Sequence, residues 1–536
     1  MHGSELDYLE LVLLALLVAV TALALVAKRL QVAYPIVLVL GGLLLSLVPR
    51  IPRVTLNPQL VFLVILPPLV FSAAFHTSWR DFRSNLTGIL MLAFGLVTFT
   101  ILGVALVMRI LVPGFAWSLG LVLGALVAAT DAIAATAIAK RLGLPRRITD
   151  LLEAESLVND GSGLVALKFT LAIVVTGVVP SFRQGTGTLL YLVFAGVIIG
   201  LVVGFLVHHV QARINDAPIE ITISLVTPYI AYLMAERLEC SGVLATLACG
   251  LYLGRRSSGL YSLHARIEAS AVWHTLDFVL NGLVFLVLGL QLPYILKDIE
   301  GIGKNNVMLD GILFSAAVLL LRFLWIFPGE WLLLRLRRLG RRKSTRVSSA
   351  EAFLLGWAGM RGVLSLAAAF SLPERLSSGE PFPYRDLLIF LTFCIIFSTL
   401  VVQGLTMPAL IRMLGLSKSR SGHDEERDAR RKMVAAALER LERIREDSGG
   451  EPREIFDYFE VLYRERLAMI EGVPDGDADS ARIGNLVKRL HVGQQLRDAE
   501  RSAAINLRNQ NKIHDEVLRR LEYEIDLLDA RFAESD

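Results

Sequence analysis

Residues 153–163 read Glu-Ala-Glu-Ser-Leu-Val-Asn-Asp-Gly-Ser-Gly, and the residues that follow, 164–179, are almost entirely apolar. A bilayer core about 30 Å thick needs roughly 20 apolar residues per helix, so residues 151–177 are long enough to cross it. A charged side chain at mid-bilayer costs on the order of 2.5–3.5 kcal/mol. The polar residues of this stretch therefore need an interaction partner or a functional role. The stretch predicts a membrane helix that contains a polar site.

The rest of the chain has the same character. It is 54% hydrophobic, with a mean hydropathy of +0.57, which is far above the values of a soluble domain. Apolar stretches recur with short polar breaks and predict about thirteen spans in an all-α polytopic membrane protein. They cover approximately residues 8–26, 34–49, 58–75, 86–111, 117–139, 151–177, 188–208, 219–236, 241–254, 270–297, 309–334, 350–373 and 386–413.

Lysine and arginine gather in alternate loops, which marks the cytoplasmic side of a membrane protein. The net charge is only +4, so the distribution carries the signal. With an odd number of spans, the pattern predicts an external N-terminus and a C-terminal tail inside, in a cell inner (plasma) membrane. The basic residues on the predicted cytoplasmic side are Lys28, Arg29, Lys140, Arg141, Arg146, Arg147, Arg255, Arg256, Arg266 and the run from Arg335 to Arg346.

The composition divides the chain into two parts. Residues 1–415 form the predicted transmembrane domain, and residues 416–536 are charged and rich in alanine, leucine, arginine and glutamate. The second part has helical periodicity and predicts a cytoplasmic, mostly helical tail. Breaks at 447–452 and 472–479 favour separate helices over one coiled coil. A dimer contact, regulation or solubility are the roles left open for it.

Charges inside the predicted spans are few: Asp131, Glu155, Asp160, Arg322 and Arg361. Two acids and two arginines can neutralise one another, which leaves one acid over. Arg322 has no acid in its own apolar stretch, and Glu155 is its best candidate partner, which would leave Asp160 free to exchange ligands. Lys168 also lies mid-span without an obvious acid partner, and the sequence leaves its role open.

The polar stretch presents oxygen atoms along one helix face. Ser156 and Asp160 are four residues apart, as are Glu155 and Asn159, so the four side chains are neighbours. Hydroxyl, amide and carboxylate oxygens suit a small hard cation. The alternative is that Ser156 and Asn159 only join helices through hydrogen bonds.

Two other spans contain signs of a broken helix. Ala128-Ala129-Thr130-Asp131 places a carboxylate and a hydroxyl mid-membrane, and residues 356–362 read Gly-Trp-Ala-Gly-Met-Arg-Gly. Irregular backbone at this depth occurs where it lines a cavity. If two such helices cross, their negative ends need a cation and their positive ends an anion. Arg361 and Asp131 fit these two roles.

These motifs resemble those of the cation:proton antiporter-1 family, the bacterial and archaeal sodium/proton antiporters related to animal sodium/proton exchangers. The resemblance covers roughly residues 8–416. It rests on four segments: Ala129-Thr130-Asp131, Glu155 to Gly161, Gly359 to Gly362 with Ser365 and Leu366, and Val402-Gln403-Gly404-Leu405-Thr406. It implies a thirteen-helix fold with inverted repeats, a dimerisation bundle and a core bundle in which the fifth and twelfth helices are unwound and cross.

The resemblance also implies roles for individual residues. Asp160 would bind cation and proton alternately, with help from Thr130, Asp131 and Ser156, so that sodium would sit at Asp160, Ser156 and Thr130. Glu155 would pair with Arg322, and Asn159 before Asp160 is associated with electroneutral exchange. The protein would be a homodimer.

Two positions depart from the family pattern. The third span of many relatives reads Leu-Phe-Glu-Ala, whereas residues 70–73 here read Val-Phe-Ser-Ala. Ser72 thus offers a hydroxyl in place of an acid, and ligand number or ion selectivity is expected to differ. The fifth span has Ala132-Ile133 where Pro-Val is usual, which bears on how sharply that helix breaks.

The sequence thus predicts a secondary transporter that exchanges Na⁺, or else Li⁺ or K⁺, for protons by alternating access, in pH and sodium homeostasis. No catalytic or phosphate-binding motif indicates an enzyme, and no cofactor or nucleic acid partner is expected. The alternatives are K⁺/H⁺ exchange by the same machinery, a channel, and a membrane sensor that acts through its tail.

Overall fold

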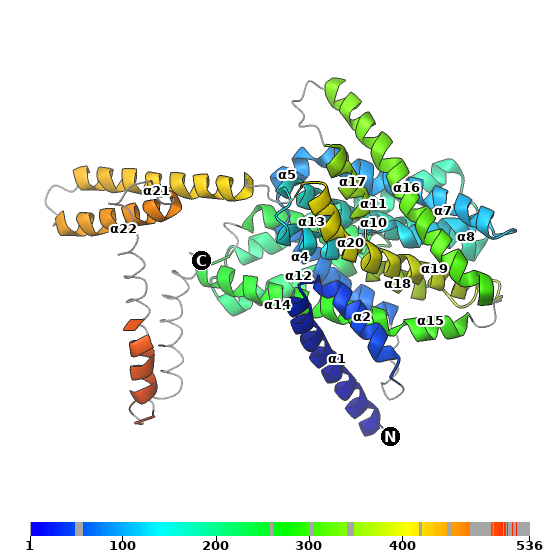
Figure 1. The fold of residues 1–536 in the computed structure, drawn as a ribbon, viewed down its shortest axis with the longest axis horizontal. Coiled ribbons are helices and arrows are strands. Elements are labelled where there is room, and N and C mark those ends of the chain that lie inside the picture. The colour runs from blue at the N-terminus through cyan, green and yellow to red at the C-terminus, as the bar shows by residue number, and fades with distance from the viewer. Residues whose placement is uncertain are drawn as a thin grey trace. The chain divides into compact units, whose positions relative to one another are not determined.

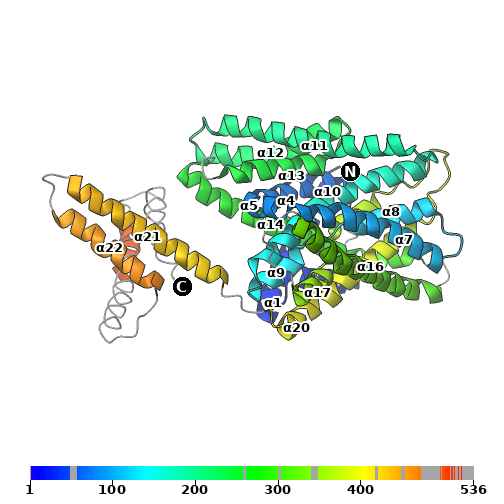
Figure 2. The same ribbon diagram turned by 90° about the horizontal axis from the view of Figure 1, so that it is seen from above.

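The computed structural model describes residues 2–48, 57–257, 261–299, 304–339, 348–416, 421–447 and 453–471, with scattered positions between 495 and 521. Within these residues the chain is helical (Figures 1 and 2), apart from loops and one isolated β-bridge between Arg375 and Pro381. The all-α prediction is confirmed. The chain divides into two compact units, Met1–Ser419 and Arg420–Asp536.

The first unit contains the apolar helices. Several spans are interrupted by short π-helical turns (η), so that one span contains more than one element. The elements are α1 (His2–Leu30), α2 (Tyr34–Ser46), α3 (Pro58–Leu60), η1 (Val61–Ile65), α4 (Leu66–His76), α5 (Trp79–Ser84), α6 (Leu86–Leu90), η2 (Met91–Leu96), α7 (Val97–Leu111), α8 (Trp117–Ala128), α9 (Ile133–Arg141), α10 (Arg146–Thr176), α11 (Phe182–Gln211), α12 (Ala217–Arg237), α13 (Gly242–Arg255), α14 (Leu263–Leu290), α15 (Leu292–Asp298), α16 (Lys304–Leu339), α17 (Ser349–Trp357), α18 (Val363–Phe370), α19 (Arg385–Ser398), η4 (Thr399–Gln403) and α20 (Gly404–Met413).

Ten stretches of the described residues, some of them built from more than one helical element, are long and apolar enough to cross a bilayer. The chain is therefore a multi-pass membrane protein. Three predicted spans differ from this pattern. Residues 34–49 and 241–254 correspond to the apolar but shorter helices α2 and α13, and residues 350–373 form two short helices, α17 and α18. Helix α13 is buried along most of its length, so its apolar character reflects packing against protein.

The helices of this unit pack in two groups. One group contains α7, α8, α10, α16, α17, α18 and α19, and the other contains α1, α2, α4, α11, α12, α13 and α14. Figure 2 shows α11, α12 and α13 side by side. Gly200 of α11 lies directly against the backbone of α13, where an added Cβ would collide with the Ala245 carbonyl. Glycine permits this close approach of two membrane helices.

The second unit contains α21 (Ser421–Asp447) and α22 (Arg453–Glu471). Arg445 joins them through ion pairs to Asp457 and Glu460, with N–O distances of 3.7 and 3.3 Å. A hydrogen bond from Lys432 lowers the pKa of the exposed Asp428 below its usual value. The predicted break at 447–452 separates these two helices, and the predicted break at 472–479 lies outside the described residues.

Candidate functional site

Two helices are broken at the centre of the first unit. Helix α8 ends at Ala128 and α9 begins at Ile133, and α17 ends at Trp357 and α18 begins at Val363. The two unwound segments touch, because the Asp131 amide donates a hydrogen bond of 2.8 Å to the carbonyl of Met360. Both breaks lie within the segments that the sequence marks, and the second lies in its glycine-rich segment. The contact leaves four helix ends facing one small region.

Each charged residue of the breaks lies at a helix end of opposite sign. The guanidinium of Arg361 donates to the carbonyls of Ala128 and Ala129 at the C-terminal end of α8. The carboxylate of Asp131 accepts a 2.8 Å hydrogen bond from the amide of Ile133 at the start of α9. Helix dipoles favour these signs. Both charges are thus compensated by backbone groups.

Gly362 allows the two broken helices to approach. A Cβ added at Gly362 would collide with the side chain of Asp131. We expect Gly362→Ala to lower the free energy of unfolding by about 1–3 kcal/mol, the usual cost of overpacking a tight site. The measurement is unfolding in detergent followed by circular dichroism. Gly88→Ala is the control, because a Cβ at Gly88 meets nothing within 4 Å. Equal stability of both variants would contradict the close contact.

Helix α10 carries the polar stretch past these breaks. The hydroxyl of Ser156 donates to the Thr130 carbonyl (2.8 Å) and accepts from the Ala132 amide (3.2 Å). The Asn159 amide donates to the Thr130 hydroxyl at 3.2 Å. Ser156 therefore holds the unwound segment from both sides, which is the helix-joining role that the sequence left open. The oxygen Oδ1 of Asn159 is buried and has no hydrogen-bond partner among the described residues.

Asp160 lies next to these groups. Among the residues that the structure describes, its carboxylate has no hydrogen bond and no ion pair. It is half-buried, and its charge interacts with that of Asp131. An ionised carboxylate without hydrogen bonds or an ion pair has a high free energy at membrane depth unless a cation or a proton neutralises it.

Glu155 and Arg322 form a buried ion pair. The Nη1–Oε1 and Nη2–Oε2 distances are 2.7 and 3.0 Å, and both side chains are 1% exposed. Arg322 also donates to the carbonyl of Leu355 through Nε and Nη2. This two-pronged geometry fixes α10 against α16 and α17 and leaves no net charge.

Two other polar residues, Ser72 and Lys168, make contacts outside this group of side chains. The hydroxyl of Ser72 donates a 2.5 Å hydrogen bond to Oδ2 of Asp277 on α14. Lys168, whose role the sequence leaves open, has an acid partner: its Nζ lies 2.8 Å from both carboxylate oxygens of Glu236 on α12. The pair is partly exposed near the end of α12, which a long lysine side chain can reach.

Comparison with known proteins gives a consistent result. Residues 13–413 match the sequence model of a family described as "Sodium/hydrogen exchanger, transmembrane". An uncharacterized Na⁺/H⁺ exchanger of Mycobacterium tuberculosis is 34% identical over 523 residues, covering 96% of this chain and 95% of the relative. The Na⁺/H⁺ antiporter ApNhaP of Aphanothece halophytica is 31% identical, covering 77% and 75%.

A relative from Bacillus pumilus is described as a sodium, potassium, lithium and rubidium/H⁺ antiporter. It is 30% identical and covers 82% of this chain and 66% of its own. Among solved structures, the sodium proton antiporter MjNhaP1 from Methanocaldococcus jannaschii superposes with a TM-score of 0.61 at 19% identity. The match covers 76% of this chain and 98% of that one and establishes a shared fold.

Proposed function

The chain belongs to the sodium/hydrogen exchanger family, as its motifs predict, and on that basis we propose that it exchanges Na⁺ for H⁺ by alternating access. The single observation that carries the proposal is the state of Asp160. This carboxylate is half-buried and unpartnered among the described residues, beside an unpartnered amide oxygen and two hydroxyls. Such a carboxylate needs a monovalent cation or a proton to neutralise its charge, and binding of the cation excludes binding of the proton.

Sodium would bind between Asp160, Ser156 and Thr130, with Asn159 alongside. Each hydroxyl oxygen has two lone pairs, and each accepts one hydrogen bond here. One lone pair on each of Ser156 and Thr130 thus remains for a cation, in addition to the free Oδ1 of Asn159. Several oxygen ligands of this kind suit a hard cation. Asp131 contributes through its charge, which favours a bound cation at Asp160.

Coupling follows from the cost of the bare carboxylate. An ionised Asp160 cannot cross an apolar barrier cheaply, so only the protonated or cation-bound site moves. The other core charges are compensated: Glu155 by Arg322, and Asp131 and Arg361 by helix ends. Asp160 is then the remaining charge among these five, and one cation replaces one proton. We therefore propose an electroneutral exchange that serves pH and sodium homeostasis.

K⁺/H⁺ exchange is the second candidate. It is favoured by the description of the Bacillus pumilus relative, which names sodium, potassium, lithium and rubidium. The same residues would bind the cation and the proton, and only the preferred size of the cation would differ. Ion selectivity therefore has to be measured directly.

The protein would work in the plasma membrane as a homodimer, with its N-terminus outside. The tail, residues 416–536, would lie in the cytoplasm. This orientation is supported by one cavity of about 400 Å³, whose lining includes Lys28, Arg141 and Arg412. Lys28 and Arg141 belong to the side that the basic-residue pattern assigns to the cytoplasm, and Arg412 lies at the end of the last span, beside the tail.

The test is exchange in liposomes that contain the reconstituted protein and an internal pH dye. We expect external Na⁺ to collapse an imposed pH gradient, with Li⁺ and K⁺ tested in parallel. Because proton and cation compete for one carboxylate, the apparent KM for Na⁺ should rise about ten-fold for each unit of pH below the titration of the site. A pH-independent KM would contradict a shared site, and no response to any cation would favour the sensor alternative.

A further inference from the structure

Asp277 is a membrane carboxylate that the mechanism above does not use. It lies near the middle of the span Ala265–Lys297, on α14. Its Oδ2 accepts the 2.5 Å hydrogen bond from Ser72 on α4, across 205 positions of sequence. Its Oδ1 is buried and has no hydrogen-bond partner among the described residues. A carboxylate at this depth is costly, so it needs a function.

No basic ion-pair partner neutralises Asp277 within the described residues. The titratable groups that face it are His76 on α4, His274 on its own helix and Tyr34 on α2. None of these is a lysine or an arginine. The contrast with Glu155, which is tied to Arg322, is clear. The carboxylate of Asp277 is therefore not held in an ion pair among the described residues, and its Oδ1 is available to a small cation.

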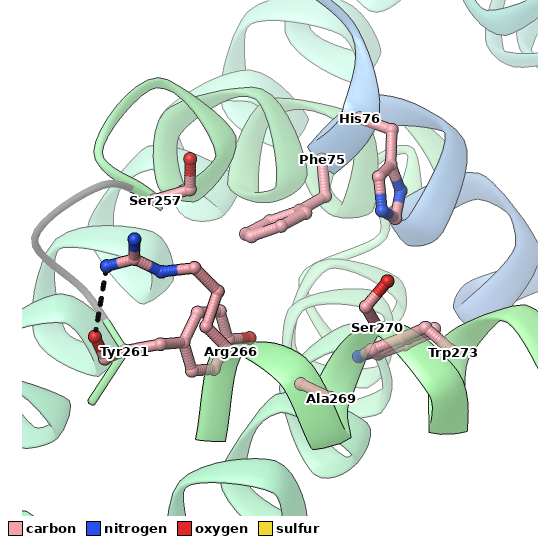
Figure 3. A pocket seen from close by; sticks show the side chains of 8 residues that line it. All are labelled: Phe75, His76, Ser257, Tyr261, Arg266, Ala269, Ser270 and Trp273. Atoms are coloured by element: carbon pink, nitrogen blue, oxygen red, sulfur yellow. Dashed lines mark hydrogen bonds between the residues drawn. The ribbon is translucent and has the colours of Figure 1, made fainter. Parts of the chain in front are cut away.

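A cavity lies on the basic side of the protein, one helical turn from Ser72 and Asp277. It has a volume of about 270 Å³, and its lining includes Ser257, Arg266, His76 and Trp273. Figure 3 shows His76 from α4 and Trp273 from α14 on the same side of this cavity. On α4, Ser72 lies four residues before His76 and therefore on the same face of the helix, one turn away. On α14, Asp277 lies four residues after Trp273 and likewise shares its face.

Tyr34 connects Asp277 to the centre of the site. Its phenol interacts electrostatically with both Asp131 and Asp277. Its ring lies 5.9 Å from that of Phe278, the neighbour of Asp277, and both aromatic residues line the larger, 400 Å³ cavity. Asp131 in turn interacts with Asp160. Tyr34 and Asp131 thus link Asp277 to Asp160 through pairwise electrostatic interactions.

We propose that Asp277 and Ser72 form a second binding site for the transported monovalent cation, on its path between the basic side of the protein and Asp160. The inference rests on the proposed exchange function and extends it. Asp277 supplies the charge, and the Ser72 hydroxyl holds its Oδ2 so that Oδ1 faces the cation.

The test compares Na⁺ dependence of exchange in liposomes for four variants and the wild type. Asp277→Asn keeps the shape of the side chain and a hydrogen-bonding group toward Ser72 but removes the charge. We expect its apparent KM for Na⁺ to rise roughly ten-fold, because an acidic lining concentrates cations locally by at least that factor. The maximal rate should stay near that of the wild type, because Asp160 is intact. Glu268→Gln, an exposed acid of the same helix, is the matched charge control and should leave KM unchanged.

Two further variants separate a cation site from a structural hydrogen bond. Ser72→Ala removes the hydrogen bond but keeps the charge, so its KM should rise much less than that of Asp277→Asn. The double variant Ser72→Asp/Asp277→Ser moves the carboxylate to the other side of the hydrogen bond and should restore most of the lost affinity. A wild-type KM in Asp277→Asn would overturn the inference while leaving exchange intact. Absence of exchange in the wild type would instead overturn the proposed function, and this inference with it.

Discussion

Asp160→Asn is expected to abolish cation-dependent proton exchange completely. The substitution keeps the size and shape of the side chain and removes the single uncompensated charge among the five core residues. A neutral amide can neither release a proton nor balance the charge of a bound cation, so neither half of the cycle can occur. The measurement is collapse of a pH gradient in liposomes on addition of Na⁺, Li⁺ or K⁺.

The control for this variant is its folding. Asp160 makes no hydrogen bond or ion pair with other described residues, so its neutralisation should leave the unfolding midpoint in detergent unchanged or higher. Asp386→Asn, at a partly exposed acid at the start of α19, should retain full exchange. Exchange at the wild-type rate in Asp160→Asn would refute Asp160 as the shared site, and loss of fold would show that the carboxylate is structural.

Arg322→Leu is expected to have the largest effect on stability. The substitution leaves Glu155 as an unpaired carboxylate that is 1% exposed, and it also removes the donors to the Leu355 carbonyl. Breaking a buried ion pair from one side costs about 3–5 kcal/mol. Unfolding in mixtures of SDS and mild detergent, followed by circular dichroism, measures the change.

A double variant and a surface pair complete this experiment. Glu155→Gln/Arg322→Gln removes both charges together and should recover part of the lost stability, because no lone charge stays buried. Lys140→Met breaks the exposed pair with Glu153, whose N–O distance is also 2.7 Å. That loss should be only about 0–1 kcal/mol. Equal costs for Lys140→Met and Arg322→Leu would show that burial does not set the strength of the central pair.

Hydropathy predicts most of the fold here because the bilayer imposes a minimum length on every lipid-facing helix. The prediction is less exact where helices are covered by protein. Helix α13, which is nearly all buried, has the composition of a span at only 14 residues. The broken helices are also visible in the sequence, since Thr130-Asp131 and the glycines around Arg361 are expensive in a continuous apolar helix. The residues at which each break begins depend on tertiary hydrogen bonds, such as that between Asp131 and Met360.

Charge balance predicts part of the candidate site. It suggests that Glu155 faces Arg322, although the two are 167 positions apart. The same criterion applied to residues 270–297 would have revealed Asp277, an acid in an apolar span that the sequence interpretation missed. Its contact with Ser72 depends on how α4 packs on α14, which no local pattern encodes. The partner of Lys168 is not obvious from the sequence because Glu236 lies at the edge of a different span.

The most direct test of the account is whether cation binding releases a proton from the protein. Isothermal titration of the detergent-solubilised protein with NaCl, in buffers of different ionisation enthalpy, measures the number of protons released per Na⁺ bound. We predict a release that approaches one proton per Na⁺ at low pH, falls as the pH rises, and is absent in Asp160→Asn. Two results would contradict a single carboxylate shared by the two ions: sodium binding with no proton release at any pH, or the same proton release in Asp160→Asn as in the wild type.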